Sequence, residues 1–130
     1  PEGEALLPVH LEDMPLDRPF DLGAHHFTRE DILRFARTFY PQPFHVDEAA
    51  AARTHFGGLC ASGWHTAAAW MKRMVAARDR GRALAVERGE PVVEGGPSPG
   101  FRDLQWLKPV YAGDTIRYDV TLTETKASLQ

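Results

Sequence analysis

The feature that most constrains this chain is an apolar helical pattern in "SGWHTAAAWMKRMVAA", residues 62–77. Ser62 is a favourable N-cap residue, and Gly63 falls in the first turn. At 100° per residue, an arc of roughly 120° holds the polar side chains of His65, Thr66, Lys72 and Arg73. Every other position is apolar or small, and a helix of this kind is buried by the rest of its fold. We therefore expect a central helix near residues 63–78.

Strand patterns lie on both sides of this helix in the sequence. In "DTIRYDVTLTE", residues 114–124, apolar side chains alternate with polar ones, which predicts a half-buried strand. "FRDLQWLKPV", residues 101–110, is expected to form a strand joined to it by the turn "YAGD". "PFDLGAHHFT", residues 19–28, is expected to form the first strand. The order predicts an α+β domain in which one antiparallel sheet surrounds one helix.

Two shorter helices are predicted before the central one. In "TREDILRFARTF", residues 28–39, Thr28 and Asp31 have the spacing of a capping box. The expected buried stripe of this helix consists of Ile32, Phe35, Ala36 and Phe39. "DEAAAARTHFGG", residues 47–58, is expected to form a second short helix capped by Asp47.

Composition narrows the class of protein. The 130 residues, with 43% hydrophobic content, suit a single domain over residues 1–130, whose residues 1–19 are expected to form an irregular arm over its surface. A net charge of −3 does not favour nucleic acid as a partner, and no apolar run reaches the length of a membrane span. The single cysteine, Cys60, cannot form an internal disulfide, so we expect a reducing, cytoplasmic location.

The stretch "FYPQPFHVDEAA", residues 39–50, places a histidine just after two prolines. Pro41 and Pro43 fix their own φ and bias Tyr40 and Gln42 towards extended geometry. We expect residues 40–45 to be a stiff, non-helical connector that presents His45 just before an acidic helix start. From this stretch alone, a surface histidine without function is the commoner interpretation.

Three pieces of the sequence together resemble a known family. They are "YPQPFH" at 40–45, "CASGW" at 60–64 and "LQWLKPVYAGDTI" at 104–116. In this order and spacing they resemble the MaoC-like dehydratases, which include the (R)-specific enoyl-CoA hydratases. The resemblance runs from about Phe20 to Glu124. It implies a hot-dog fold, an antiparallel sheet wrapped around a long central helix, and a homodimer.

The resemblance also implies a site. His45 matches the catalytic histidine, but Tyr40 stands where the family has its catalytic aspartate, and Gln42 replaces an asparagine. A carboxylate is ionised at neutral pH whereas a phenol is ordinarily protonated, so Tyr40 is a poor base. We expect hydratase activity to be weakened by this substitution. Asp47 or Glu48, just beyond His45, are alternative sources of a carboxylate.

The start of the central helix is the other implied part of the site. Backbone N–H groups of a first helical turn lack intrahelical partners, so Gly63 would offer an oxyanion hole to an acyl-thioester carbonyl. The alternative is that Gly63 only lets the helix start pack tightly against a strand. The catalytic residues implied are His45, Tyr40 and Gly63. The substrate-binding residues implied are Gln42, Phe44, Ser62 and Trp64.

The substrate implied is a thioester of coenzyme A or of a carrier protein, in fatty acid metabolism, with no further cofactor. Two other functions stay open, because Tyr40 disfavours hydration: an acyl-CoA thioesterase, and a non-catalytic acyl-thioester-binding protein. No metal site is indicated, since neighbouring His25 and His26 would point to opposite faces of a strand. A nucleophilic Cys60 is less favoured than a small buried side chain. Since the family pattern continues with at least one more strand, we expect the full-length protein to extend past Gln130.

Overall fold

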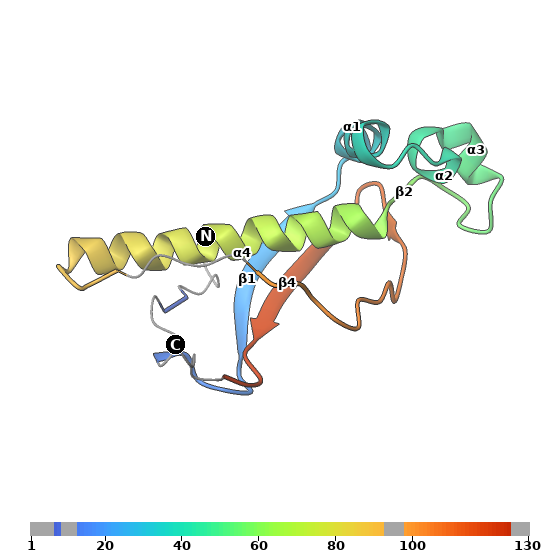
Figure 1. The fold of residues 1–130 in the computed structure, drawn as a ribbon. Helices are drawn as coiled ribbons and strands as arrows, with labels where there is room; N and C mark the ends of the chain where they lie inside the picture. Colours follow the sequence, from blue (N-terminus) through green and yellow to red (C-terminus); the bar gives the residue numbers. More distant parts are fainter. Residues whose placement is uncertain (1–6, 9–12, 93–97, 126–130) are drawn as a thin grey trace. The chain divides into compact units, whose positions relative to one another are not determined.

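The structure, a computed structural model, describes residues 7–8, 13–92 and 98–125. The chain divides into two compact units. The first consists of Pro1–Gly23, Lys72–Ser98 and Arg117–Gln130, and the second of Ala24–Met71 and Pro99–Ile116. Figure 1 labels strands β1 (Pro19–His26) and β4 (Thr115–Thr121) and helix α4 (Gly63–Glu87). Each of these three elements has residues in both units.

Strands β1 and β4 form a two-stranded sheet. In the second unit the Phe27 N–H donates to the Asp114 carbonyl at 2.8 Å, and in the first the Asp17 N–H donates to the Leu122 carbonyl at 2.7 Å. Early residues of one strand therefore meet late residues of the other, which is the antiparallel arrangement. Exposed and half-buried residues alternate along β4, as predicted.

Helix α1 (Arg29–Phe39) begins at the predicted cap, where the Thr28 side chain accepts from the Asp31 N–H at 3.1 Å. The Asp31 carboxylate pairs with Arg34, so the reciprocal half of the capping box is not made. The buried residues are Ile32, Leu33 and Ala36. The predicted burial of Phe39 is wrong, since its side chain is 70% exposed. Periodicity identifies the inward side of a helix, but not how far along it the covering surface extends.

Helices α2 (Pro43–Val46) and α3 (Glu48–Ala52) follow α1. The expectation that the connector over residues 40–45 is non-helical is therefore wrong at its end, where His45 lies on the single turn of α2. Proline is tolerated at the first position of a helix because the N–H that it lacks has no partner there, and Pro43 stands at that position. The Asp47 cap of α3 is confirmed, since its carboxylate accepts from the Ala50 N–H at 3.1 Å.

Helix α4 contains the predicted central segment, residues 63–78. Its start at Gly63 is confirmed, and the charged segment that follows residue 78 continues the helix to Glu87. The helix meets β1 in the first unit, where the Arg73 Nε–H donates to the Leu22 carbonyl at 2.8 Å. Contrary to the prediction, the apolar side chains of α4 are not buried all round the helix. Trp64 and Met71, which share one side of α4, are exposed because no described helix or strand covers that side. In the ranges described, no helix combines the length and apolarity needed to cross a membrane.

The predicted strand over residues 101–110 is wrong except at its end. Only strand β3 (Val110–Tyr111) forms, and it pairs antiparallel with β2 (Cys60–Ala61). Residues 98–109 have neither helix nor strand geometry. An alternating pattern becomes a strand only when a neighbour accepts its backbone hydrogen bonds, and no described strand pairs with residues 101–109. The "YAGD" turn is as predicted, with the Asp114 carboxylate accepting from the Tyr111 N–H at 2.9 Å.

Candidate active site

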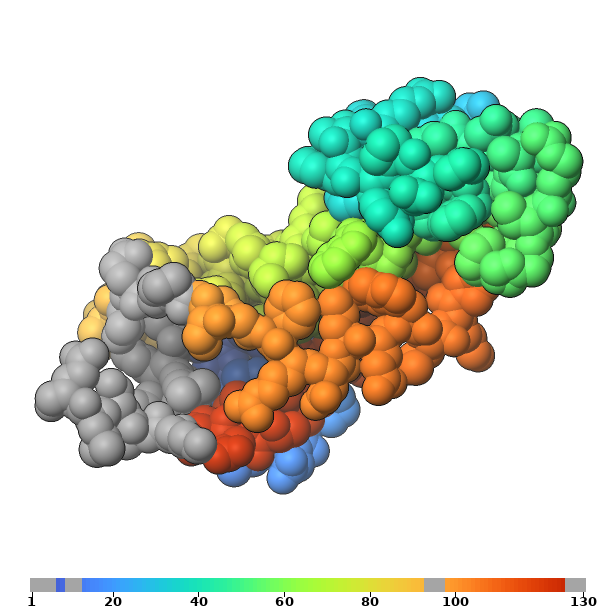
Figure 2. All heavy atoms as spheres, turned by 45° about the vertical axis from the view of Figure 1, so that its right-hand side comes forward, coloured from blue at the N-terminus to red at the C-terminus, as the bar shows by residue number. Residues whose placement is uncertain are grey.

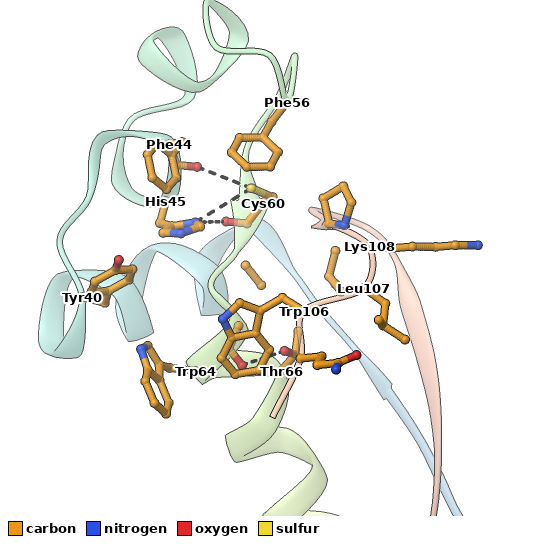
Figure 3. A pocket seen from close by; sticks show the side chains of 15 residues that line it. Tyr40, Phe44, His45, Phe56, Cys60, Trp64, Thr66, Trp106, Leu107 and Lys108 are labelled. Atoms are coloured by element: carbon orange, nitrogen blue, oxygen red, sulfur yellow. Dashed lines mark hydrogen bonds between the residues drawn. The ribbon is translucent and has the colours of Figure 1, made fainter. Parts of the chain in front are cut away.

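The second unit contains a cavity of about 430 Å³ that collects most of the predicted site residues (Figure 3). Its walls come from α2, β2, the first turn of α4 and the segment that leads into β3. The lining residues that bear on the argument are Tyr40, Phe44, His45, Cys60, Gly63, Trp64, Trp106 and Lys108.

The position of the proton on His45 follows from one hydrogen bond. His45 is buried, with 6% of its surface exposed, and its Nδ1 lies 2.6 Å from the Cys60 carbonyl oxygen. Because a carbonyl oxygen only accepts, Nδ1 carries the proton and Nε2 of the neutral ring has a free lone pair. Burial lowers the pKa of His45, and the hydrogen bond to Cys60 opposes that shift. The ring is therefore neutral at neutral pH and able to act as a base through Nε2.

Cys60 has the features of a small buried side chain. Its Sγ lies 3.9 Å from Nδ1 of His45, and burial raises the pKa of the thiol. A thiol is nucleophilic as the thiolate, which burial disfavours. The nearer histidine nitrogen is also a donor, engaged with the carbonyl of Cys60, so it does not accept the thiol proton. These contacts favour the buried interpretation over the nucleophile.

Tyr40 and Phe44 both lie against the imidazole of His45. The centroid of the Tyr40 ring is 5.7 Å from that of His45, and the Phe44 ring meets His45 edge-on at 4.5 Å. Tyr40 is exposed, and no described residue makes a hydrogen bond to its hydroxyl. The position that carries an aspartate in the resembling family thus presents a phenol beside His45, at the cavity wall (Figure 3).

Gly63 lines the cavity as the first residue of α4. Its N–H has no acceptor within the helix, and the described residues place no other acceptor on it. Ser62 is not a lining residue: its Oγ accepts from the His65 N–H at 3.1 Å and so caps the helix. Gln42 does not line the cavity either, and its carbonyl accepts from the His45 N–H at 2.9 Å. These two residues position their neighbours.

The alternative carboxylates lie elsewhere. Asp47 caps α3 and Glu48 pairs with Arg29, and both line a separate hollow of the second unit. No aspartate or glutamate is among the residues that line the cavity around His45. His45 is therefore the candidate base of this site. Within the described ranges, no group of three histidine, cysteine or acidic side chains is placed to hold a metal ion.

Trp106 also forms a wall of the cavity, although it was not among the residues predicted from the sequence. An ideal Cβ built on Gly63 would lie 2.2 Å from Cδ2 and Cε2 of the Trp106 indole. Gly63 therefore lets the helix start pack closely, but its neighbour is a ring from an irregular segment and not the expected strand. Lys108, which also lines the cavity, is in the same segment. The signal was present in "LQWLKPV", since alternate residues of an extended segment share a side.

Known proteins with a similar sequence or structure point to one family. The family model that describes the MaoC-like domain matches residues 13–130 of this sequence. The crystal structure of the MaoC-like dehydratase from Rhodospirillum rubrum has a TM-score of 0.73 and 36% identity, over 91% of this chain and 73% of that one. The X-ray structure of a monoamine oxidase regulatory protein from Archaeoglobus fulgius has a TM-score of 0.66 and 26% identity, over 93% and 74%.

A more distant structure shares the fold. The (R)-hydratase from A. caviae involved in PHA biosynthesis has a TM-score of 0.55 at 20% identity, over 88% of this chain and 76% of that one. Among sequences, the uncharacterized protein YdeM of Bacillus subtilis (strain 168) is 29% identical over 111 residues, 83% of this chain and 69% of that protein. The predicted hot-dog fold class is confirmed by these structures and by the long helix and antiparallel strands. The chain belongs to the MaoC-like dehydratase family.

Proposed function

We propose that this protein acts on an enoyl thioester as a hydratase or dehydratase, with weakened activity, at the cavity that contains His45 and Gly63. The observation that carries the proposal is the hydrogen bond from Nδ1 of His45 to the Cys60 carbonyl. It leaves Nε2 as a base in a cavity that also contains the unpartnered N–H of a helix start. Membership of a dehydratase family supports the same reaction class.

In the hydration direction, Nε2 of His45 accepts a proton from water as the water oxygen bonds to the β-carbon. The electron pair of the double bond moves through the α-carbon to the thioester carbonyl. The Gly63 N–H then donates to the enolate oxygen that forms, where the positive end of the helix dipole also lies. The imidazolium of His45 returns its proton to the α-carbon, so the step balances without a second acid or base. Tyr40 orients the water.

We propose a thioester of coenzyme A or of a carrier protein as the substrate. Phe44 and Trp64 give apolar surface for an acyl chain, and Lys108 gives a cation at the same cavity for an anionic part of the carrier. Coenzyme A enters only as part of the substrate, and the reaction as written needs no other cofactor. We also propose that the protein has a role in fatty acid metabolism, forms a homodimer and is located in the cytoplasm. Support for that location is the single cysteine, which is buried and free.

A non-catalytic acyl-thioester-binding protein is the second candidate. It is favoured by the cavity wall itself, which has a phenol at position 40 and no carboxylate. Such a site would hold the acyl group against Phe44 and Trp64 without adding water to it.

Incubation with crotonyl-CoA separates the candidates when enone absorbance and free thiol are followed together. Slow loss of the enone that disappears in His45→Ala is the expected result. A matched control is His26→Ala, which removes an exposed histidine outside the cavity and should leave the rate unchanged. Release of thiol instead would indicate a thioesterase, and binding with neither signal would indicate the binding protein. Hydration that survives His45→Ala would show that this cavity is not the site.

A further inference from the structure

The Trp106 indole lies against the helix start at which the proposed thioester carbonyl would bind. A Cβ on Gly63 would lie 2.2 Å from two indole carbons and 2.7 Å from a third, Cε3. These distances are shorter than any van der Waals contact, so the indole lies directly on the backbone at the helix start. An acyl group bound at this helix start must share the cavity with the ring, or displace it.

The surroundings of Trp106 allow the ring to move. Its side chain is 51% exposed, and residues 99–109 lie on the surface without helix or strand geometry (Figure 2). Its ring contact is with Trp64, edge to face at a centroid distance of 5.6 Å, and Trp64 is itself exposed. A side chain with two rotatable bonds and half its surface in solvent can change rotamer without disturbing a packed core.

We infer that Trp106 is the specificity-determining residue of this site: its indole covers Gly63 in the free protein and limits the length of acyl group that the cavity accepts. This inference rests on the proposed function, since it concerns the acyl group of the same thioester. The indole and Trp64 form two aromatic walls beside the helix start. A short acyl group fits beside the displaced ring, whereas a long one competes with it for the same apolar volume.

The first test follows the indole directly. The chain has three tryptophans, so protein labelled with 5-fluorotryptophan gives three ¹⁹F resonances, and Trp106→Phe assigns one of them. Butyryl-CoA is expected to shift the Trp106 resonance, whereas free coenzyme A, which lacks the acyl group, should not. Trp70 does not line the cavity and is the internal control. Gly63→Ala is expected to shift the Trp106 resonance without ligand, because the new methyl group and the ring cannot occupy the same space.

The second test measures acyl-length preference by calorimetry. Trp106→Ala is expected to improve binding of octanoyl-CoA relative to butyryl-CoA by about tenfold, because the emptied volume accepts further methylene groups. Trp106→Phe, which keeps a ring, should change this ratio less. It still tests the inference if the alanine variant does not fold. If Trp106→Ala changed the affinity for both thioesters equally, the inference would be overturned and the proposed function would stand. The same holds if butyryl-CoA bound without shifting the Trp106 resonance. Failure of wild type and of both variants to bind either thioester would overturn the proposed function with it.

Discussion

At the scale of single residues, the site depends on one hydrogen bond and one substitution. The bond from Nδ1 of His45 to the Cys60 carbonyl fixes the tautomer, and so decides which nitrogen is basic. Tyr40 lies beside that ring with a phenol where the family pattern has a carboxylate. The combination gives a base without the carboxylate partner that the family pattern has.

Tyr40→Asp is expected to increase the rate of crotonyl-CoA hydration, because it places an ionisable carboxylate beside His45. Loss of one member of an acid–base pair typically costs about 10²–10⁴-fold, and part of that factor should return. Initial rates of enone loss provide the measurement. Tyr40→Asn is the matched control, since it has the size of aspartate without the charge. A rate no higher in Tyr40→Asp than in Tyr40→Asn would contradict this role for position 40.

At the scale of elements, a buried histidine joins α4 to α1 and to the end of β1. The His65 ring stacks on Phe35 at a centroid distance of 4.4 Å and meets Phe27 at 5.0 Å. Desolvation by burial, aided by the nearby His25 and His45 and opposed by Asp31, lowers the pKa of His65 to about 4. The packing between these elements therefore requires a neutral ring.

His65→Phe is expected to reduce the loss of stability in acid. Between pH 6.5 and about 4 the unfolded chain binds a proton at this residue that the folded chain does not, so stability is full above pH 6.5 and falls as pH decreases. Between pH 7.5 and 5.0 the wild type should lose about 2 kcal/mol more than His65→Phe. Urea unfolding at both pH values measures the difference. His55→Phe, at an exposed histidine, should lose as much unfolding free energy between pH 7.5 and 5.0 as the wild type. If the wild type, His65→Phe and His55→Phe all lost the same amount, His65 would not be the cause of the acid sensitivity.

Helix α4 also depends on a glycine in its middle. In the first unit, a Cβ on Gly81 would lie 2.0 Å from the backbone carbonyl oxygen of Leu7. Gly81→Ala should therefore destabilise the protein by about 1–3 kcal/mol, although alanine has the higher helix propensity. Thermal unfolding measures this. Gly58→Ala, whose Cβ would meet only a Tyr111 ring carbon at 3.9 Å, is the control that should change stability little.

At the scale of the whole molecule, exposed apolar side chains support the proposed homodimer. In the second unit, Phe101 and Leu107 are exposed, as are Trp64 and Met71 on α4. Exposed aromatic and aliphatic groups of this size gain free energy when a second chain covers them. Light scattering at micromolar concentration should give twice the mass of one chain. A single-chain mass that persists through a concentration series would contradict the dimer.

The sequence by itself determined the elements whose signals are local. Thr28 and Asp47 cap their helices as predicted, the start of α4 follows from Ser62, and the alternation of β4 is visible in its residues. The three short motifs were sufficient to identify the family and its fold class. The single domain over residues 1–130 stays a prediction, as do the roles of the site residues.

Tertiary structure decided what depends on residues far apart in the chain. The proton on His45 depends on a carbonyl 15 residues away, and the cover over Gly63 comes from Trp106. The failure of residues 101–109 to form a strand, despite their pattern, reflects the lack of a described pairing partner. Local patterns encode φ, ψ and the side of an element that turns inward. They do not encode which distant backbone group or ring meets that side, because that choice is made by packing.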